Sequence, residues 1–458
     1  MTEIDLSKRS IAIFGTGVTG LSVARFLSAR NLSFVFVDSR ESPPALSELL
    51  STYPEVSIHT GPFKDSILDN IDLIVLSPGI SLEEPVLVEA GHRGIEIVGD
   101  LTLFYSTATA PAIAITGSNG KSTVTSLVGE MASASGLNVG VGGNLGTPML
   151  DLLNQDRQLY VLELSSFQLE TVDSNKATVA VLLNISSDHM DRYASMDDYI
   201  RAKHKVFGNH SVAIVNRQDQ FTAPSSVKTP LSFGLDEPDE GHFGIRQKDG
   251  IEYLCIGQEC LIAIDEIALK GAHNIANVTA AVAIGESINL PRQTMLQVLR
   301  DFNGLDHRCQ TVASINDVVF INDSKGTNVG ATNAAITSFG RSQQKNIILI
   351  AGGQSKGQDF GVLARTVGDF VKRCILFGED AHQIYDSLQS VVSVDLASSL
   401  VEAVSMAKLT AEAGDTVLFS PACASLDQFS GFEERGECFA QAVLASLQSA
   451  TGEMGALC

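Results

Sequence analysis

The sequence is short of basic residues. Its 458 residues include 31 Lys and Arg against 53 Asp and Glu, which gives a formal net charge of −22. Nucleic acids and anionic membranes are bound through basic patches that release counterions. A balance this acidic argues against either of them as the main partner.

Long apolar runs and a basic leader are also missing. No run of apolar residues approaches the roughly 20 needed to cross a bilayer. The chain begins Met1-Thr2-Glu3-Ile4-Asp5, which is acidic where a signal peptide would be basic. We therefore expect a cytoplasmic protein without membrane insertion, and we expect a monomer.

The cysteines show no metal-binding pattern. Cys255 and Cys260 are the closest pair along the chain, and no second pair or histidine partner follows them. The spacing predicts reduced thiols that pack as small hydrophobic side chains in a cytosolic protein. The seven lie at positions 255, 260, 309, 374, 423, 438 and 458.

What the chain does have is the composition of a globular protein. Hydrophobic residues make up 44% and charged residues 18%, which excludes general disorder. Domains commonly span about 100–200 residues, so this length predicts two to four of them.

Three stretches repeat one pattern, in which a short β-branched run leads into a polar or Gly-rich turn and then a helical pattern. They start at Ser10, Ala112 and Val318. Buried strands that alternate with helices are typical of parallel sheets covered on both faces. We therefore expect an α/β protein of three domains.

The expected domains are a Rossmann-like N-terminal domain (1–98), a central P-loop-type ATPase domain (99–303) and a C-terminal Rossmann-like domain (304–458). Pro, Gly and acidic clusters with short alternating runs at 216–260 predict a small antiparallel insertion.

The first turn reads Gly15-x-Gly17-x-x-Gly20, with Asp38 at the end of the next predicted strand. In the dinucleotide fingerprint such glycines let the backbone approach a diphosphate, and the carboxylate binds ribose hydroxyls. Alone, this motif favours a nicotinamide dehydrogenase. A UDP-sugar fits the same loop, and a Gly-rich turn kept for tight packing remains a third reading.

The second turn reads Gly117-Ser-Asn-Gly-Lys-Ser-Thr123, between a predicted strand and a predicted helix. Backbone N–H groups at a helix start bind anions, Lys121 can bridge phosphates, and Ser122 can bind Mg²⁺. Ile115 occupies the place of the first P-loop glycine. A chance Gly-Lys-Ser turn is the alternative, but the flanking elements favour ATP.

Two more polar residues follow predicted strands. Glu163 ends the strand predicted at 159–162, and His189 follows the strand predicted at 179–183. Open α/β sheets place ligands at such strand ends, so both are candidate Mg²⁺ ligands. Taken singly, His189 is more often a hydrogen-bonded structural histidine and Glu163 a helix-capping partner.

Taken together, eight ordered stretches resemble the Mur ligase family. The resemblance covers nearly the whole chain and implies domains that bind a UDP-linked substrate, ATP and an amino acid. The stretches are Gly117–Thr123, Leu162–Glu170, Asp188–Tyr193, His273–Asn277, Asp306–Arg308, Asn322–Asn328, Gly352–Phe360 and Ser420–Phe429.

The resemblance also implies a reaction. ATP phosphorylates a substrate carboxylate, an amine attacks the acyl phosphate, and release of phosphate leaves a new amide. Within the family, the pattern is most similar to ligases that add D-glutamate to UDP-N-acetylmuramoyl-L-alanine in peptidoglycan precursor synthesis. The implied small-molecule substrates are these two and ATP, with two Mg²⁺ ions.

The family's ATP and metal residues carry over position by position. The implied catalytic residues are Lys121, Glu163, His189 and Lys203. The implied metal ligands are Ser122, Glu163, His189 and Lys203, the last as a carbamate, although an exposed helix lysine is the alternative there. ATP would be bound by Gly117, Ser118, Asn119, Gly120, Lys121, Ser122, Thr123, Asn274, Asn277, Arg308, Asp323 and Lys325.

The remaining positions concern the other two substrates. Ser39 and Gly326 differ from common family residues without removing a needed group. D-glutamate would be bound by Thr327, Lys356, Ser425 and Phe432. The UDP-linked substrate would be bound by Gly15, Thr16, Gly17, Gly20, Asp38, Ser39, Arg40 and Asn144.

Other functions stay open at this point. A different Mur-type ligase or a folylpolyglutamate synthase would use another amino acid. A regulatory protein that senses UDP-sugars would need the phosphate loop but not Lys203 together with Lys356. The dehydrogenase reading is weakened, because no stretch beyond the first fingerprint offers an acid–base pair for hydride transfer.

Overall fold

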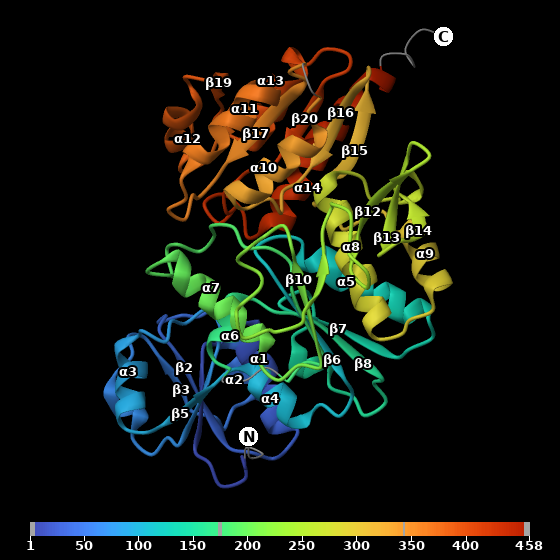
Figure 1. Ribbon diagram of the computed structural model, residues 1–458. Helices are drawn as coiled ribbons and strands as arrows, with labels where there is room; N and C mark the ends of the chain where they lie inside the picture. The colour runs from blue at the N-terminus through green and yellow to red at the C-terminus, as the bar shows by residue number, and fades with distance from the viewer. Residues whose placement is uncertain (1–4, 173–175, 342–343, 453–458) are drawn as a thin grey trace. The chain divides into compact units, whose positions relative to one another are not determined.

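The computed structural model describes residues 5–172, 176–341 and 344–452, and this part of the chain contains three β-sheets (Figure 1). It forms two compact units. The first unit comprises residues up to Ile185 with Asp197–Ile267 and Ala276–Asp301; the second comprises Ser186–Met196, Ala268–Ile275 and the residues from Phe302 onward.

The N-terminal sheet has the strand order β3-β2-β1-β4-β5, and all its strands are parallel. The strand order reverses between β1 and β4, which is where such sheets bind ligands. The elements are β1 (Ile11–Phe14), α1 (Val18–Ser28), β2 (Phe34–Asp38), α2 (Leu46–Thr52), β3 (Ile58–Thr60), η1 (Asp65–Leu68), β4 (Leu73–Leu76), α3 (Pro85–His92), β5 (Glu96–Val98) and α4 (Asp100–Thr107).

The second sheet has the order β14-β13-β12-β11-β10-β9-β6-β8-β7. From β7 to β12 the strands pair in parallel, and β12, β13 and β14 pair antiparallel. Its strands are β6 (Ala112–Thr116), β7 (Val139–Gly143), β8 (Leu159–Glu163), β9 (Val179–Leu182), β10 (Val212–Asn216), β11 (Leu231–Phe233), β12 (Phe243–Lys248), β13 (Ile251–Ile256) and β14 (Glu259–Ala263).

Helices connect the parallel strands of this second sheet. The strand β6 is entirely buried, as its Ala-Ile-Ala-Ile-Thr sequence requires. The helical elements are α5 (Lys121–Ala134), η2 (Met149–Leu152), α6 (Ser166–Glu170), α7 (Met196–His204), η3 (Lys205–Phe207), η4 (Ile264–Glu266), α8 (Ala272–Ser287) and α9 (Arg292–Asp301).

The C-terminal sheet has the order β15-β16-β20-β17-β18-β19, antiparallel only between β15 and β16. Its elements are β15 (Gln310–Ile315), β16 (Val318–Asn322), α10 (Val329–Phe339), β17 (Ile347–Gly352), η5 (Phe360–Leu363), α11 (Ala364–Phe370), β18 (Val371–Phe377), α12 (Ala381–Leu388), β19 (Ser393–Leu396), α13 (Leu400–Thr410), β20 (Thr416–Phe419) and α14 (Phe432–Gly452).

Each face of the C-terminal sheet has its own hydrophobic core. Successive residues of a strand point to opposite faces, so Leu349 packs in one core and Ile350 in the other. Helices α10, α11 and α12 contribute to the first core, and α13 and α14 contribute to the second. The sheet is therefore covered on both sides.

The expected α/β fold class is confirmed by these sheets, and the antiparallel insertion is observed at β12–β14. The boundaries expected near residues 98 and 304 fall between β5 and α4 and between α9 and β15. Within the described ranges, no helix is both long and apolar enough to span a membrane.

Candidate active site

The phosphate-type loop lies between β6 and α5, at the carboxyl end of a central parallel strand. Gly120 has φ +83° at the helix start, and a side chain added there would collide with Asn277. Glycine is therefore required at this position. The first residues of α5 present their backbone N–H groups at the loop, as an anion site needs.

Two residues outside the motif hold this loop. Asn184 follows β9 and pairs with Asn119 through two hydrogen bonds: the Asn119 amide donates to Asn184 Oδ1 (2.8 Å), and Asn184 Nδ2 donates to the Asn119 carbonyl (3.0 Å). The hydroxyls of Ser118 and Tyr199 share a hydrogen bond of 2.9 Å. The loop conformation is thus set by neighbouring elements of the first unit.

Two lysines meet at this loop. Lys121 Nζ donates to the carbonyls of Gly117 (2.8 Å) and Ser118 (2.9 Å), and Lys203 Nζ donates to the same Gly117 carbonyl (2.8 Å). The two amine nitrogens therefore lie within twice that distance of each other. The structure brings together two residues that are 82 positions apart in the sequence.

Lys203 is not an exposed helix lysine. Its side chain is only 2% exposed, on the inner face of α7, and its Nζ lies 4.8 Å from the centroid of the Tyr199 ring. Lys205, two residues later, turns away and donates to the Glu170 carbonyl. Burial of an ammonium group is costly unless hydrogen bonds or opposite charges compensate it.

Glu163 ends β8, which pairs with β6 so that Glu163 lies beside Ile115, just before the phosphate-type loop. Its side chain is 2% exposed, and Glu163 Oε1 accepts a hydrogen bond of 2.6 Å from Asn144 Nδ2. The family resemblance places Asn144 on the UDP side of the substrate. In the structure Asn144 also contacts Glu163, the expected metal ligand.

His189 belongs to the second unit, where it has φ +57°. Its Nε2 lies 3.6 Å from Asp188 Oδ2, and the same carboxylate oxygen accepts a hydrogen bond of 3.2 Å from Asn328 Nδ2. A backbone in the left-handed region is uncommon for a residue with a side chain. The Asp188 carboxylate thus lies beside this imidazole.

The two asparagines of α8 differ in their surroundings. Asn277 lies against Gly120, so it faces the phosphate-type loop of the first unit. Asn274 Nδ2 donates to the Lys270 carbonyl (3.0 Å) at the start of the helix. Both side chains are largely buried.

In the N-terminal sheet, the Gly15–Gly20 turn connects β1 to α1 as the fingerprint predicts. A side chain on Gly20 would overlap the Gly15 carbonyl, so the turn and helix can approach only with glycine there. The backbone can therefore come close to a diphosphate at the switch point of this sheet.

Asp38 is engaged within the protein rather than left open to a ribose. Oδ2 accepts from the Thr16 amide (3.0 Å), the Thr16 hydroxyl (2.6 Å) and Arg40 Nη2 (2.7 Å), and Oδ1 accepts from the Arg40 amide and Nε. Burial would raise the pKa of Asp38, but these bonds hold it well below its usual range. Asp38 thus orders Thr16 and Arg40, while Ser39 stays exposed.

The second unit groups several of the expected ATP residues. Burial raises the pKa of Asp323 to about 6, although a hydrogen bond from Ser420 Oγ (2.7 Å) and the charge of Arg308 oppose this rise. The Cys309 amide donates to Asp323 Oδ1 (3.2 Å). The charge of Arg308 therefore acts on Asp323 within the second unit.

The four expected D-glutamate residues lie on loops that follow β16, β17 and β20 and at the start of α14. Lys325 Nζ lies 3.7 Å above the Phe432 ring, and Thr327 donates its amide to the Lys325 carbonyl (2.8 Å). Lys356 has φ +53°, and Ser425 is buried. Carboxyl ends of adjacent strands thus carry this group of residues.

The donor chemistry of the first unit fits Mg²⁺. Glu163 and the Ser122 hydroxyl are buried hard oxygen donors, and Mg²⁺ is held by one or two carboxylates plus substrate phosphates. Across the described ranges no group of three or more His, Cys, Asp or Glu could hold a metal ion.

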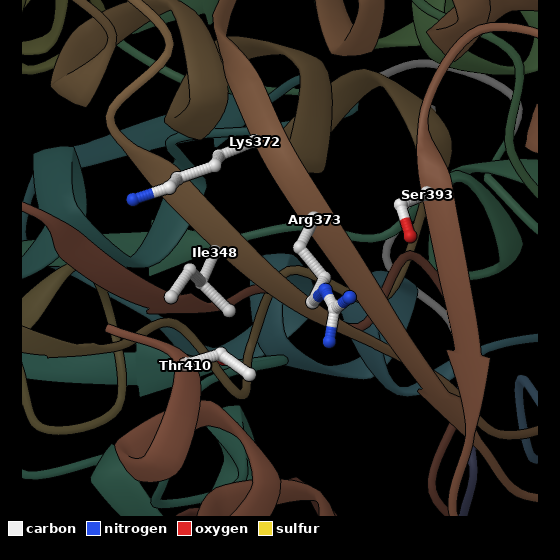
Figure 2. A pocket seen from close by; sticks show the side chains of 5 residues that line it. All are labelled: Ile348, Lys372, Arg373, Ser393 and Thr410. Atoms are coloured by element: carbon white, nitrogen blue, oxygen red, sulfur yellow. The ribbon is translucent and has the colours of Figure 1, made fainter. Parts of the chain in front are cut away.

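A separate pocket of ≈ 350 Å³ lies in the second unit (Figure 2). Its two basic side chains are neutralised: Lys372 Nζ pairs with Glu412 (2.6 Å) and Asp415 (3.0 Å), and Arg373 pairs with Asp395 (3.1 Å). The pocket includes none of the expected site residues. Its lining consists of Ile348, Lys372, Arg373, Ser393 and Thr410.

Sequence reasoning missed Asn184 and Tyr199. Asn184 directly follows β9, the parallel neighbour of β6, so its position at a strand end was an available signal. Tyr199 lies on α7, one turn before Lys203, and only the fold brings its hydroxyl to Ser118. Both residues support the loop rather than extend the motif.

Comparison with known proteins agrees with this architecture. Residues 9–99 match the Mur ligase MurD-like N-terminal domain, residues 115–285 match the Mur ligase middle domain, and residues 307–423 match the Mur ligase glutamate ligase domain. The three matches correspond to the three sheets.

Curated relatives cover nearly the full chain. The chain is 47% identical over 440 residues to UDP-N-acetylmuramoylalanine--D-glutamate ligase of Pseudomonas savastanoi pv. phaseolicola, which covers 96% of this chain and 98% of the relative. Relatives with the same name from Pseudomonas aeruginosa and Legionella pneumophila (strain Paris) are 48% and 46% identical, each over 94% of this chain and 97% and 98% of their own.

Solved structures share the fold. UDP-N-acetylmuramate-alanine ligase MurC from Thermotoga maritima aligns with a TM-score of 0.60 at 17% identity and covers 96% of this chain and 100% of its own. MurF from Acinetobacter baumannii aligns with a TM-score of 0.58 at 19% identity, over 90% and 87%. With its full-length relatives and three matched domains, the chain belongs to the Mur ligase family.

Proposed function

We propose that this protein is an ATP-dependent ligase that joins D-glutamate to UDP-N-acetylmuramoyl-L-alanine in peptidoglycan precursor synthesis. The relatives at 45–48% identity carry the name of that activity. The observation that carries the proposal is local: a phosphate-type loop has two lysine amines at the Gly117 carbonyl and a buried carboxylate, Glu163, on the next strand.

The chemistry requires activation of a carboxylate. An ionised carboxylate is a poor electrophile and repels the γ-phosphate of ATP. In the proposed reaction a carboxylate oxygen of the alanyl group attacks the γ-phosphorus, and ADP leaves. The D-glutamate amine then attacks the acyl carbon, loses a proton, and expels inorganic phosphate to leave the amide.

In the first unit, Lys121 and the N–H groups at the start of α5 would hold the phosphates and stabilise the charge that develops during transfer. Asn277, against Gly120, would lie on the adenine side of the nucleotide. Asn184 and Tyr199 keep the loop in shape before ATP arrives, which lowers the cost of ordering it.

A divalent cation would be held by Ser122 and Glu163, with a carbamate on Lys203 as a further oxygen donor and His189 as a candidate ligand. When bound, Mg²⁺ would neutralise the phosphate and carboxylate oxygens. The carbamate forms from the neutral amine and CO₂, with loss of a proton. Two ammonium groups at one carbonyl oxygen repel each other, which supports a neutral or modified Lys203.

The N-terminal sheet would bind the UDP moiety through the Gly15–Gly20 turn, with Thr16 and Arg40 ordered by Asp38. The second unit would contribute Arg308, Asp323 and Lys325 toward ATP. It would also contribute Thr327, Lys356, Ser425 and Phe432 toward D-glutamate, where the Lys356 cation can pair with a carboxylate.

A substrate panel tests the proposal. The protein is incubated with ATP, Mg²⁺ and UDP-N-acetylmuramoyl-L-alanine, together with D-glutamate, L-glutamate, L-lysine or meso-diaminopimelate in separate reactions. We expect phosphate release and a product heavier by one glutamate residue with D-glutamate alone. Release that depends on lysine or diaminopimelate would instead assign another ligase step, and no release with any amino acid would favour a UDP-sugar sensor.

A further inference from the structure

Arg435 is the largest fully buried side chain in the described part of the chain. It lies in the first turn of α14 and is 0% exposed. Burial of a charge is strongly unfavourable unless hydrogen bonds replace the lost water. A guanidinium kept in such a position therefore needs a structural or functional reason.

All five hydrogen bonds of this guanidinium go to neutral oxygens. Nε donates to Ser324 Oγ (3.1 Å), Nη2 donates to the carbonyls of Ser324 (2.8 Å) and Cys423 (3.1 Å), and Nη1 donates to the carbonyls of Cys423 (3.1 Å) and Ala424 (3.0 Å). Over the described ranges, no carboxylate oxygen lies within 4.0 Å of it.

The charge of Arg435 is therefore only partly compensated. Burial lowers the pKa of Arg435 to about 10, and the negative groups near it, Asp427 and Asp323, together with Cys423, act in the opposite direction. The guanidinium still carries its proton at neutral pH. A persistent positive charge thus lies beneath the loops that it contacts.

These loops have one topological origin. The strands β16, β20 and β17 are adjacent in the sheet, and their carboxyl ends lead into the loops that contain Ser324, Cys423 and Gly353. A side chain on Gly353 would lie 3.2 Å from Arg435 Nη1, so this third loop also packs against the guanidinium. The Arg435 side chain therefore contacts three separate loops.

Each joined loop carries a candidate residue for the amino-acid substrate. Thr327 lies three residues after Ser324, Ser425 follows Ala424 directly, and Lys356 lies three residues after Gly353. Phe432, the fourth candidate, precedes Arg435 by one turn, and its carbonyl accepts a hydrogen bond of 2.8 Å from Ser324 Oγ. One side chain thus connects all four segments.

The same loops hold strained backbone. Ala422 has φ +58° and Lys356 has φ +53°, which are uncommon conformations for residues with side chains. Such conformations persist only when their surroundings enforce them. Two of the five hydrogen bonds of Arg435 go to the Cys423 carbonyl, next to Ala422, and supply part of that enforcement.

We infer that Arg435 is a positioning residue for the amino-acid substrate: it fixes the loops of Thr327, Lys356 and Ser425, and its charge favours binding of a dicarboxylate above them. The inference rests on the proposed function for the identity of that substrate. Arg435 would not touch the substrate, so its effect reaches D-glutamate through these loops and through the electrostatic field.

Steady-state kinetics of three full-length variants test the inference. Arg435→Lys keeps the charge but not the five-bond geometry, and Arg435→Gln removes the charge. Arg373→Gln is the matched control, because Arg373 lies in the same sheet and pairs with Asp395 away from the candidate residues. All three are compared with wild type for the KM of each substrate.

We expect the KM for D-glutamate to rise about 10-fold in Arg435→Lys, as loss of one charged hydrogen bond would cause, and about 100-fold in Arg435→Gln. The KM for the UDP-linked substrate should stay within about twofold of wild type, because its candidate residues lie in the first unit. The KM for ATP should rise less than the KM for D-glutamate, because Asp323 and Lys325 lie on only one of the three joined loops. Arg373→Gln should change none of them.

A purely structural role predicts a different result, namely a lower melting temperature and less active enzyme with all three KM values unchanged. That result would overturn the inference. If Arg435→Gln does not fold, Arg435→Lys decides by the same criterion. If wild type uses another amino acid, the KM of that amino acid replaces the one for D-glutamate, so failure of the proposed function is seen separately.

Hydrogen exchange gives a second test that needs no turnover. In Arg435→Lys, amide exchange should rise in residues 323–327, 352–358 and 420–427 and stay at the wild-type level in the phosphate-type loop of the first unit. A rise in amide exchange of equal size across the whole second unit would contradict the positioning role. So would unchanged exchange in these three loops.

Discussion

Among the described residues, each compact unit buries one basic side chain almost completely, and the two side chains are held in different ways. In the first unit, Lys203 is 2% exposed and donates to the Gly117 carbonyl, where Lys121 also donates. In the second unit, Arg435 is 0% exposed and donates five hydrogen bonds to three residues. An amine can lose its proton and be modified, whereas a guanidinium stays charged.

This difference matches the chemistry that each unit is proposed to perform. A phosphate-transfer site needs oxygen donors for a metal ion, so a lysine that converts to a carbamate is useful there. A pocket for a dicarboxylate needs a lasting positive potential and fixed loops. An arginine whose three guanidinium nitrogens all donate hydrogen bonds to those loops can supply both. The same type of burial therefore serves two functions, depending on the side chain.

The largest expected effect concerns the lysine that remains a cation in the first unit. Lys121→Ala should lower turnover by about 10²–10³-fold, because it removes a charge that stabilises the transferring phosphate. The melting temperature should change little. Lys205→Ala is the control, since Lys205 donates only to the Glu170 carbonyl. Near-normal turnover in Lys121→Ala would contradict a role for Lys121 in stabilising the transferring phosphate.

The second effect tests whether the buried lysine acts as a modified group. Both Lys203→Arg and Lys203→Met should lower turnover by roughly 100-fold, since neither side chain can form a carbamate and a lost metal-site partner typically costs 10–100-fold. Wild type supplied with ¹³C-bicarbonate should show one carbamate signal that Lys203→Met lacks. Higher activity in Lys203→Arg than in Lys203→Met would show that the charge itself is needed.

The fold was predictable where the pattern is local. Each β-branched run followed by a polar or Gly-rich turn forms a strand and a helix start, because strand burial and turn geometry depend on neighbouring residues. The phosphate-type loop at Gly117–Thr123 was found for this reason. The helix predicted after this loop is observed as α5, Lys121–Ala134.

Contacts between distant segments could not be predicted in the same way. The pairs Asn119–Asn184, Lys203–Gly117 and Arg435–Ser324 join residues far apart in sequence, and no period or motif marks them. Asp38 shows a second limit. Its position was foreseen from the fingerprint, but its two oxygens are occupied by Thr16 and Arg40, which only the folded backbone reveals.

Each of the two units also contains a buried carboxyl group, Asp100 in the first and Asp323 in the second. Burial raises the pKa of both Asp100 and Asp323 to about 6, from 3.8. Asp100 Oδ2 accepts from Gln168 Nε2 (3.2 Å) and Oδ1 accepts from the Leu101 amide (2.9 Å). Between about pH 4 and pH 6, each folded unit therefore still holds a proton that its unfolded chain has already released.

The sign of the pH effect follows from this difference. Where the folded state binds more protons, stability falls as pH rises, so ionised Asp100 destabilises the protein above pH 6. Asp100→Asn removes the ionisable group while its Oδ1 can still accept from the Leu101 amide, so its stability relative to wild type should rise by roughly 2–3 kcal/mol between pH 4.5 and pH 8. Urea unfolding at the two pH values measures it, and an equal pH slope in both proteins would contradict it.

The smallest expected effect concerns the cysteines, which are placed differently in the two units. In the first unit, Cys255 and Cys260 face each other across the β13–β14 hairpin with their Sγ atoms 3.0 Å apart. Burial raises the pKa of Cys255, Cys374 and Cys423 alike to about 12, so the two units differ here in the thiol partner that lies beside Cys255 and not in the fraction of thiolate. Cys255 and Cys260 are therefore placed to form a disulfide.

Mild oxidation with diamide distinguishes the two arrangements. Diamide takes up two hydrogens as the two thiols form one disulfide, so the native protein should lose two thiols and two hydrogens in mass. Cys260→Ser should lose neither. Turnover should stay unchanged, because no candidate site residue lies on β13 or β14. Oxidation that starts at Cys374 or Cys423 instead would mean that the second unit opens more readily than the first, and it would reverse the comparison between their buried groups.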